Sequence, residues 1–311
     1  MTTRVFTSAP ATLPLMLKAA LPAIPVAGGL PGIKHATGTT PDLVLERHGV
    51  TTDRRHLDAY NEVCGFPRGD VLPTTYPHMA AFALHMTLMT DTSFPFAPMG
   101  LVHLRNTITQ HRPIRVDESF DVSVHAADLR PHAKGSLIDI VTVATIPSTG
   151  SGGGSTGSGG GSTGSGGSEV VWEETMTLFC RHKGGSAETT PAPLAGVEAP
   201  AGVVHWKLAG DLGRRYAAVS GDRNPIHLYP LTAKAFGFPT NIAHGMWTLA
   251  RSLAAVQNKL PESFTNVAEF RKPILLPSTV VFGSSTDGDV LTFGVKGTKK
   301  PVTHLVGQVR V

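Results

Sequence analysis

The sequence predicts an α+β protein built from two similar modules, each with one long buried helix followed by antiparallel strands. The chain has 311 residues, which is enough for two ordinary domains or one duplicated domain. Residues 79–89 and 246–256 are apolar over the length of a helix, and runs rich in β-branched residues follow each of them. Short segments also recur between the two halves of the chain.

The recurring segments indicate a duplicated module. Residues 73–78 (PTTYPH) align with residues 239–244 (PTNIAH), and the same offset pairs Arg105 with Arg271. The second copy carries extra residues after Gly221, so a function that resides in this insertion is present in the second copy alone. We expect the two modules to pair edge to edge into one continuous sheet.

The strands are predicted where β-branched residues alternate with polar ones. The segments are 119–124, 137–146 and 171–179 in the first module, and 280–284, 291–295 and 305–311 in the second. Between two of them, residues 148–168 are only Gly, Ser and Thr, a composition that cannot bury apolar surface. We predict that this tract is a flexible loop joining two strands of one sheet.

The boundary between the modules is predicted in residues 184–202 (GGSAETTPAPLAGVEAPAG), whose Pro, Ala and Gly content is typical of an interdomain linker. The N-terminal module then spans 1–183 and includes the 148–168 loop. The C-terminal module spans 203–311.

Composition excludes several classes of function. The net charge is +4 and the Lys and Arg residues are scattered, which argues against nucleic-acid binding. The two cysteines, Cys64 and Cys180, lack metal-ligand neighbours, so we expect buried, reduced thiols in a cytoplasmic protein and no metal site. Lys18 and several prolines interrupt the apolar N-terminal stretch, so neither a signal peptide nor a membrane span is expected.

One segment of the C-terminal module carries the residues for acid–base chemistry. Gly221 permits a tight turn, Asn224 is a natural N-cap, and Pro225 fits the first position of a short helix. His227 would lie in the first turn of that helix, with Asp222 just before it. A carboxylate and an imidazole can converge across such a bend on a single water molecule, as general acid–base catalysis requires.

Gly245 is predicted at the start of the apolar helix 246–256. The N-terminus of a helix presents unpaired N–H groups and the positive end of the helix dipole, and a glycine lets a ligand approach the backbone closely. A thioester carbonyl held there would be polarised as its oxygen gains negative charge.

The motifs Y-x-x-x-S-G-D-x-N-P-I-H and G-F-P-x-x-I-A-H-G-M span about thirty residues of the C-terminal module, from Tyr216 to Met246. They resemble the hydratase motif of the MaoC-like, (R)-specific enoyl-CoA hydratase family. The whole chain is similar, more loosely, to the double-hotdog members that act as 3-hydroxyacyl-thioester dehydratases. The resemblance implies a double hotdog, in which each module wraps an antiparallel sheet around its long helix.

The resemblance also implies residue roles. Asp222 and His227 would form the catalytic pair that binds and activates water, and the Gly245 amide would hold the thioester oxygen. Ser220 and Asn224 would shape the substrate-binding loop.

Further substrate contacts are expected from Met246 on the apolar helix and from Arg271 and Lys272, which we place at the opening of the following strand. The two cations could contact the phosphates of CoA or of a phosphopantetheine arm. Because Arg105 aligns with Arg271, a structural ion pair is an open alternative. Tyr229 stands where the family often has Asp.

The N-terminal module lacks an Asp-x-x-x-x-His motif, and Met79 replaces the helix-start glycine, so one active site per chain is expected. His78 and His244 align with each other, and we predict a structural role for both. The N-terminal module would replace the second subunit of a dimeric hotdog and help to shape the acyl tunnel. The protein is then expected to be a monomer that forms a pseudo-dimer, or a homodimer.

The expected reaction is the reversible syn addition of water to a trans-2-enoyl thioester of CoA or acyl carrier protein, giving the (R)-3-hydroxyacyl thioester. No cofactor is expected, because the thioester itself acidifies C2. Two alternatives remain open at this stage: a hotdog acyl-CoA thioesterase, and a non-catalytic subunit that binds acyl thioesters.

Overall fold

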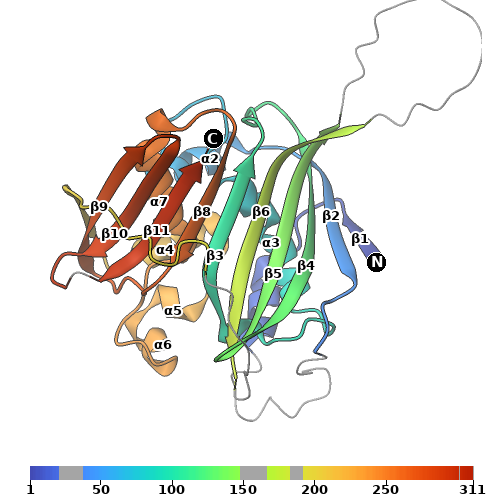
Figure 1. Cartoon of the computed structure of the whole chain (residues 1–311). Coiled ribbons are helices and arrows are strands. Elements are labelled where there is room, and N and C mark those ends of the chain that lie inside the picture. Colours follow the sequence, from blue (N-terminus) through green and yellow to red (C-terminus); the bar gives the residue numbers. More distant parts are fainter. Residues whose placement is uncertain (21–37, 148–166, 183–191, 301, 311) are drawn as a thin grey trace, which may run out of the picture.

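The fold is a double hotdog, shown in Figure 1 as a computed structural model that describes residues 1–20, 38–147, 167–182, 192–300 and 302–310. Its described strands form one sheet in the order β1-β2-β4-β5-β6-β3-β8-β11-β10-β9-β7. The first six belong to the N-terminal half: β1 (Thr2–Phe6), β2 (Leu43–Val50), β3 (Leu101–Gln110), β4 (Phe120–His132), β5 (Gly135–Pro147) and β6 (Ser168–Arg181). The others are β7 (Val204–Leu208), β8 (Phe264–Phe270), β9 (Ser278–Asp287), β10 (Val290–Gly297) and β11 (Thr303–Arg310).

The two modules meet where β3 and β8 pair as antiparallel neighbours, with Thr107 opposite Val267. This pairing confirms the expected continuous sheet (Figure 1). The junction removes an exposed edge from each module, since an unpaired edge strand is a template for association with other chains.

Each module places one long helix against its part of the sheet: α3 (Pro77–Met89) in the first and α7 (Gly245–Val256) in the second. Both confirm the predicted apolar helices. Most residues of α3 are buried, as expected of a helix that is apolar nearly all round. The other helices are α1 (Thr12–Ala20), α2 (Arg54–Cys64), α4 (Leu212–Ser220), α5 (Pro225–Leu228) and α6 (Pro230–Ala235), with short 3-10 turns η3 (Pro98–Gly100) and η4 (Gln257–Lys259).

The six predicted strands are present, but the sequence did not predict β1, β2, β3, β7 and β8. The central strands β3 and β8 lack a continuous β-branched run. Polar residues interrupt both, and Asn106 and Asn266 are fully buried in them. Their strand conformation depends on neighbours on both sides, β6 and β8 for β3, and β3 and β11 for β8.

The two halves share a second local feature besides the long helix. The isolated bridges Val71–Arg115 and Ile242–Leu275 occupy equivalent places, because each joins the segment before the long helix to the segment after the central strand. Val71 lies six residues before α3, and Ile242 lies three residues before α7. The connections to the two helices therefore differ in length, and the alignment of residues 73–78 with residues 239–244 stays a prediction.

The two low-complexity segments fall largely outside the described residues. Of the 148–168 tract, only 167 and 168 are described, and its flanks confirm the predicted pairing because Pro147 lies opposite Ser168 between β5 and β6. Of the predicted linker, 192–202 are described. Leu194 packs there with Ala199 and Val306, and its N–H donates to Glu269. The module boundaries themselves stay a prediction.

Cys64 is buried as expected, whereas Cys180 is only partly buried because it lies near the end of β6. Among the described residues, no helix has the length and apolar character needed to cross a membrane. The cytoplasmic location stays a prediction.

Candidate active site

The predicted acid–base loop joins α4 to α5. Helix α4 ends at Gly221, whose φ of 75° is a left-handed conformation that glycine adopts without strain. The Asn224 side chain caps α5 by accepting a hydrogen bond from the N–H of Ile226 at 3.3 Å. The N–H of Asp222 donates to Ser220 Oγ at 3.1 Å. These local contacts fix the loop that presents Asp222.

The Asp222 carboxylate has a neighbour at each oxygen, and His244 Nε2 lies 3.7 Å from its Oδ2. Its Oδ1 accepts a hydrogen bond from the N–H of Asn224 at 3.0 Å. The side chain is 28% exposed and lines a cavity. Asp222 therefore presents a carboxylate in a fixed position to a ligand in that cavity.

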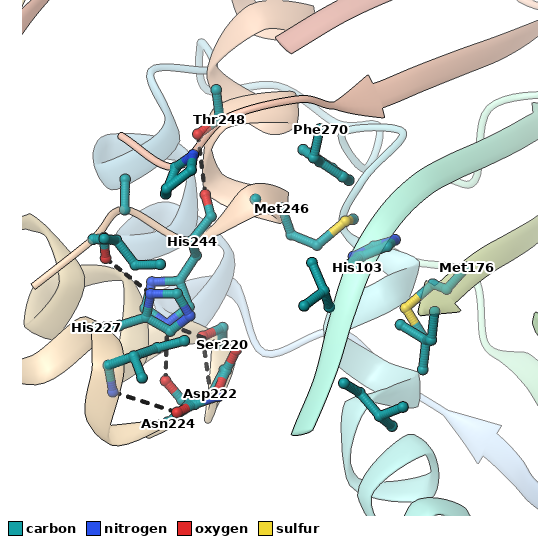
Figure 2. Close-up of a pocket in the computed structure, with 18 of the residues that line it drawn as sticks. His103, Met176, Ser220, Asp222, Asn224, His227, His244, Met246, Thr248 and Phe270 are labelled. Carbon is teal, nitrogen blue, oxygen red and sulfur yellow. Dashed lines mark hydrogen bonds and ion pairs between the residues drawn. The ribbon is translucent and has the colours of Figure 1, made fainter. Parts of the chain in front are cut away.

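His227 is buried in α5 and points toward the same place (Figure 2). Its Nδ1–H donates to the carbonyl oxygen of Ile242 at 2.8 Å, which leaves Nε2 as the nitrogen that carries a free electron pair. Burial lowers the pKa of His227, although the nearby Asp222 acts in the opposite direction. The imidazole is therefore neutral near pH 7 and can accept a proton.

His244 is a third member of the site, although the sequence predicted only a structural role for it. Its ring stacks on His227 with centroids 3.7 Å apart, and its Nε2–H donates to the backbone carbonyl of Asp222 at 3.0 Å. Burial, and then the neighbouring His227, lower the pKa of His244 to about 3, so this ring also stays neutral. One signal was available in the sequence: His244 directly precedes the glycine at the helix start.

These three side chains offer ligand atoms within 4.8 Å of one another, so a metal ion has to be considered. The lone pairs of an imidazole lie in the plane of its ring, and the planes of His227 and His244 are stacked at 26°. The two rings therefore cannot direct their lone pairs toward one ion between them. The arrangement suits acid–base chemistry better than metal binding.

Gly245 begins α7, and its backbone lies against the cavity as predicted. A side chain at this position would meet the Phe270 ring at 3.2 Å, which is closer than ordinary contact. Glycine therefore lets the Phe270 ring pack directly against the start of α7. Met246 lies next in α7, buried, and its side chain borders the same space (Figure 2).

The cavity has a volume of about 490 Å³, within the range of sites that hold a drug-sized ligand. Both modules line it: Ser220, Asn224 and Asp222 come from the C-terminal half, while Phe82 and Met176 come from the N-terminal half. The predicted N-terminal contribution to the wall of this space is thus observed.

Arg271 and Lys272 also line the cavity, but they follow the last residue of β8 and do not open a strand as we expected. Arg271 donates to the Leu194 carbonyl at 2.8 Å and lies 3.6 Å from Glu269. Arg105, predicted as its equivalent, lies within β3 and donates to Thr177 at 3.3 Å. Arg271 is therefore partly committed to contacts within the protein.

Tyr229, which stands where the family often has Asp, is 52% exposed between α5 and α6. The guanidinium of Arg214 lies 5.0 Å from the centre of its ring. Tyr229 therefore packs on the outside of the loop and leaves the hydrogen bonds of His227 intact.

The chain is similar to several known proteins. The family described as MaoC like domain matches residues 198–307. The 3-hydroxyacyl-thioester dehydratase X of Mycobacterium tuberculosis is 34% identical over 97% of this chain and 98% of its own length. A crystal structure of HtdX from the same organism has a TM-score of 0.70 at 32% identity and covers 86% of this chain and 99% of that chain.

A MaoC-like dehydratase from Phytophthora capsici has the same fold, with a TM-score of 0.63 at 17% identity, covering 88% of this chain and 95% of that one. The identity to the mycobacterial relative extends along nearly the whole of both chains, so it includes the N-terminal module as well as the acid–base loop. The chain therefore belongs to the family of MaoC-like double-hotdog hydratases and dehydratases.

Proposed function

We propose that this protein adds water reversibly to trans-2-enoyl thioesters at Asp222 and His227, giving (R)-3-hydroxyacyl thioesters. The observation that carries the proposal is the pairing of a fixed carboxylate with the unprotonated Nε2 of His227 beside the N-terminus of α7. An acid–base pair and an oxyanion site are together sufficient for addition to a double bond conjugated with a carbonyl.

In hydration, a water molecule held between the Asp222 carboxylate and His227 Nε2 attacks C3 of the enoyl thioester. One of the two groups takes a proton from the water as the C3–O bond forms, and electrons move through C2 onto the thioester oxygen. The N–H of Gly245 at the positive end of α7 stabilises that oxygen. The proton then returns to C2 from the same face, which makes the addition syn.

Dehydration reverses these steps: a proton leaves C2, hydroxide leaves C3 with a proton from the pair, and the double bond forms. Both directions need one carboxylate and one neutral imidazole. The lowered pKa of His227 keeps the imidazole in the proton-accepting form at neutral pH. No redox step occurs in either direction.

The substrate is a thioester of CoA or of acyl carrier protein. Lys272, together with Arg271, would meet the phosphates of the carrier at the cavity wall. Ser220, Asn224 and Met246 would contact the substrate near the reacting carbons. The N-terminal module acts as the second half of a pseudo-dimer and leaves one active site per chain.

Hydration is tested by the loss of the ultraviolet absorbance band of the conjugated enoyl thioester, with crotonyl-CoA and a longer trans-2-enoyl-CoA. Asp222→Asn and His227→Gln should each lower kcat/KM by at least ~10²-fold, as the loss of a general acid or base does. Arg223→Gln is the matched control, because Arg223 is exposed on the same loop and should leave the rate unchanged.

Two results would contradict the proposal. Release of free thiol from a saturated acyl-CoA, without loss of the enoyl band from its unsaturated counterpart, would favour a thioesterase. A folded wild-type protein that binds acyl thioesters but converts none of them, as CoA or carrier-protein thioesters, would favour a binding subunit. Chiral analysis of the 3-hydroxyacyl product tests the (R) assignment separately.

A further inference from the structure

Helix α1 borders the cavity, although the sequence predicted no role for it. Its Met16 lines the cavity and is 9% exposed. Met16 and Ala19 pack against Phe82 and Met86 of α3, and these four residues form a cluster separate from the main core. Phe82 and Met86 line the cavity as well. The cavity is therefore bounded here by two helices of the N-terminal module, α1 and α3.

The start of α1 lies beside the acid–base loop. A Cβ added to Gly221 would lie 3.5 Å from the Phe82 ring and 3.6 Å from the methyl group of Thr12. Gly221 directly precedes Asp222 in the loop. Met16 follows Thr12 by about one turn of α1, which is a rise of about 6 Å. Helix α1 therefore runs from the acid–base loop to the part of the cavity wall that Met16 forms.

The lining of the cavity differs in chemical character from place to place. Arg271 and Lys272, which follow β8, supply cations that suit the phosphates of a carrier. The lining from α1, α3 and η3 is apolar and includes Met16, Phe82, Met86, Met89 and Met99. Methionine side chains are flexible and fit apolar ligands of irregular shape. An acyl chain should therefore lie against the wall that α1 and α3 form, because burial there removes its apolar surface from water.

Contacts at the N-terminus fix the position of α1. Strand β1, which precedes it, pairs with β2 in parallel, with Thr2 opposite Leu43. Arg4 Nη1 lies 3.0 Å from the carboxylate of Asp91, shortly after the end of α3. The opposite face of α1 is open to solvent, since Leu17 is 63% exposed. The helix thus presents Met16 to the cavity and its neighbour Leu17 to water.

We propose that α1 closes the acyl end of the cavity and that Met16 limits the length of the acyl chain. The inference rests on the proposed function, because it concerns the acyl thioester bound at the same site. With C3 placed between Asp222 and His227, a crotonyl group has only one further carbon and stays beside the acid–base loop. A longer chain extends along α3 until it meets Met16. The limit lies at medium chain length, because about one helical turn separates Met16 from Thr12 beside the loop.

The test measures binding and does not depend on turnover. Saturated acyl-CoA thioesters from butanoyl to dodecanoyl have no conjugated double bond and no 3-hydroxyl, so neither hydration nor dehydration can consume them. Their affinities for the wild-type protein are measured by calorimetry. The affinity should rise by up to roughly fourfold for each methylene group that becomes buried, and it should stop rising at a limiting chain length.

The limiting length should move when the side chain at position 16 changes size. Met16→Ala opens the wall, so the first thioester beyond the wild-type limit should bind at least about fivefold more tightly than it binds wild type. Met16→Trp fills the same space and should move the limit to shorter chains. Leu17→Ala is the matched control, because Leu17 lies on the exposed face of the same helix and its removal should leave the limit unchanged. Melting temperatures show that the variants are folded.

A limit that stays in place in folded Met16→Ala would overturn the inference, as would an equal shift in Leu17→Ala. An affinity that does not depend on chain length, or no measurable binding of any member of the series, would also overturn it. Each of these results would assign α1 to packing on α3 alone. Failure of the proposed function is distinguishable, because it shows as absent hydration of crotonyl-CoA while the chain-length series is measured by binding.

Discussion

The ring of His227 lies almost parallel to that of His244, with their centroids 3.7 Å apart. The two rings come from different elements: His227 from the short helix α5, and His244 from the residue that precedes α7. Each donates one N–H to a backbone carbonyl, His227 to Ile242 and His244 to Asp222. The stack therefore joins the acid–base loop to the start of α7.

Replacing His244 with Phe should keep the ring stack but remove the hydrogen bond to the Asp222 carbonyl. We expect kcat/KM for enoyl-CoA hydration to fall by about 10²-fold, because a misplaced reacting group can cost this much even when it is still present. The melting temperature of the variant is measured alongside to exclude general unfolding. An unchanged kcat/KM in a folded variant would mean that other contacts hold Asp222 in place.

Replacing Gly245 with Ala should push against Phe270, because the new Cβ would lie 3.2 Å from its ring. Phe270 lines the cavity and would have to shift, so we expect kcat/KM to fall by roughly tenfold. The double variant Gly245→Ala/Phe270→Leu removes the opposing ring and should recover part of the loss. No recovery would argue that the alanine acts through the helix start itself and not through Phe270.

The rate of hydration should fall on the acidic side of the pH profile, as His227 becomes protonated and can no longer accept a proton. Burial lowers the pKa of His227, so the midpoint of this fall should lie below the ordinary histidine value of about 6.5. The measurement is kcat/KM with crotonyl-CoA against pH. A midpoint above 6.5 would show that Asp222 outweighs burial at this site.

Stability should also decrease in acid. A histidine whose pKa is lowered in the folded protein contributes stability that is complete above the unfolded-state pKa and is lost as pH falls toward the folded-state pKa. For His85 this window extends from about 6.5 down to about 3. Within it the free energy of unfolding should change by roughly 1.4 kcal/mol per pH unit for this group.

Urea denaturation of wild type and His85→Leu between pH 7 and pH 4 measures this slope. The free energy of unfolding of the variant should depend less steeply on pH than that of wild type, whatever its absolute value. His205→Gln serves as the control, because His205 is exposed and its removal should leave the slope unchanged. If the free energy of unfolding of wild type and of His85→Leu depends equally on pH, burial does not lower the pKa of His85 in the folded protein.

Replacing residues 148–167 with Asn-Gly should leave both activity and melting temperature essentially unchanged. The reason is that Pro147 and Ser168 already lie opposite each other in β5 and β6, so a short hairpin turn can connect them. This variant also tests the proposal that the tract belongs within the N-terminal module. A loss of folding would show that the tract contributes to the structure beyond connecting two strands.

Local signals determined much of this protein from its sequence. Apolar runs of helical length placed α3 and α7, and β-branched segments placed six strands. The order Gly221, Asp222, Asn224 and His227 predicted the turn, the cap and the short helix, because capping and turn chemistry depend on residues a few positions apart. The candidate acid–base pair could therefore be named before its geometry was known.

Only the tertiary structure decided which distant residues meet. His78 reaches Glu174 across 96 positions of the chain, and the register of β3 and β6 brings Asn106 to the same carboxylate. The cavity likewise depends on β3 pairing with β8, which brings His78, His85 and His103 of the N-terminal module to the same cavity as the acid–base loop. A periodic pattern fixes which face of an element is buried, but only the packing of the whole sheet fixes what that face contacts.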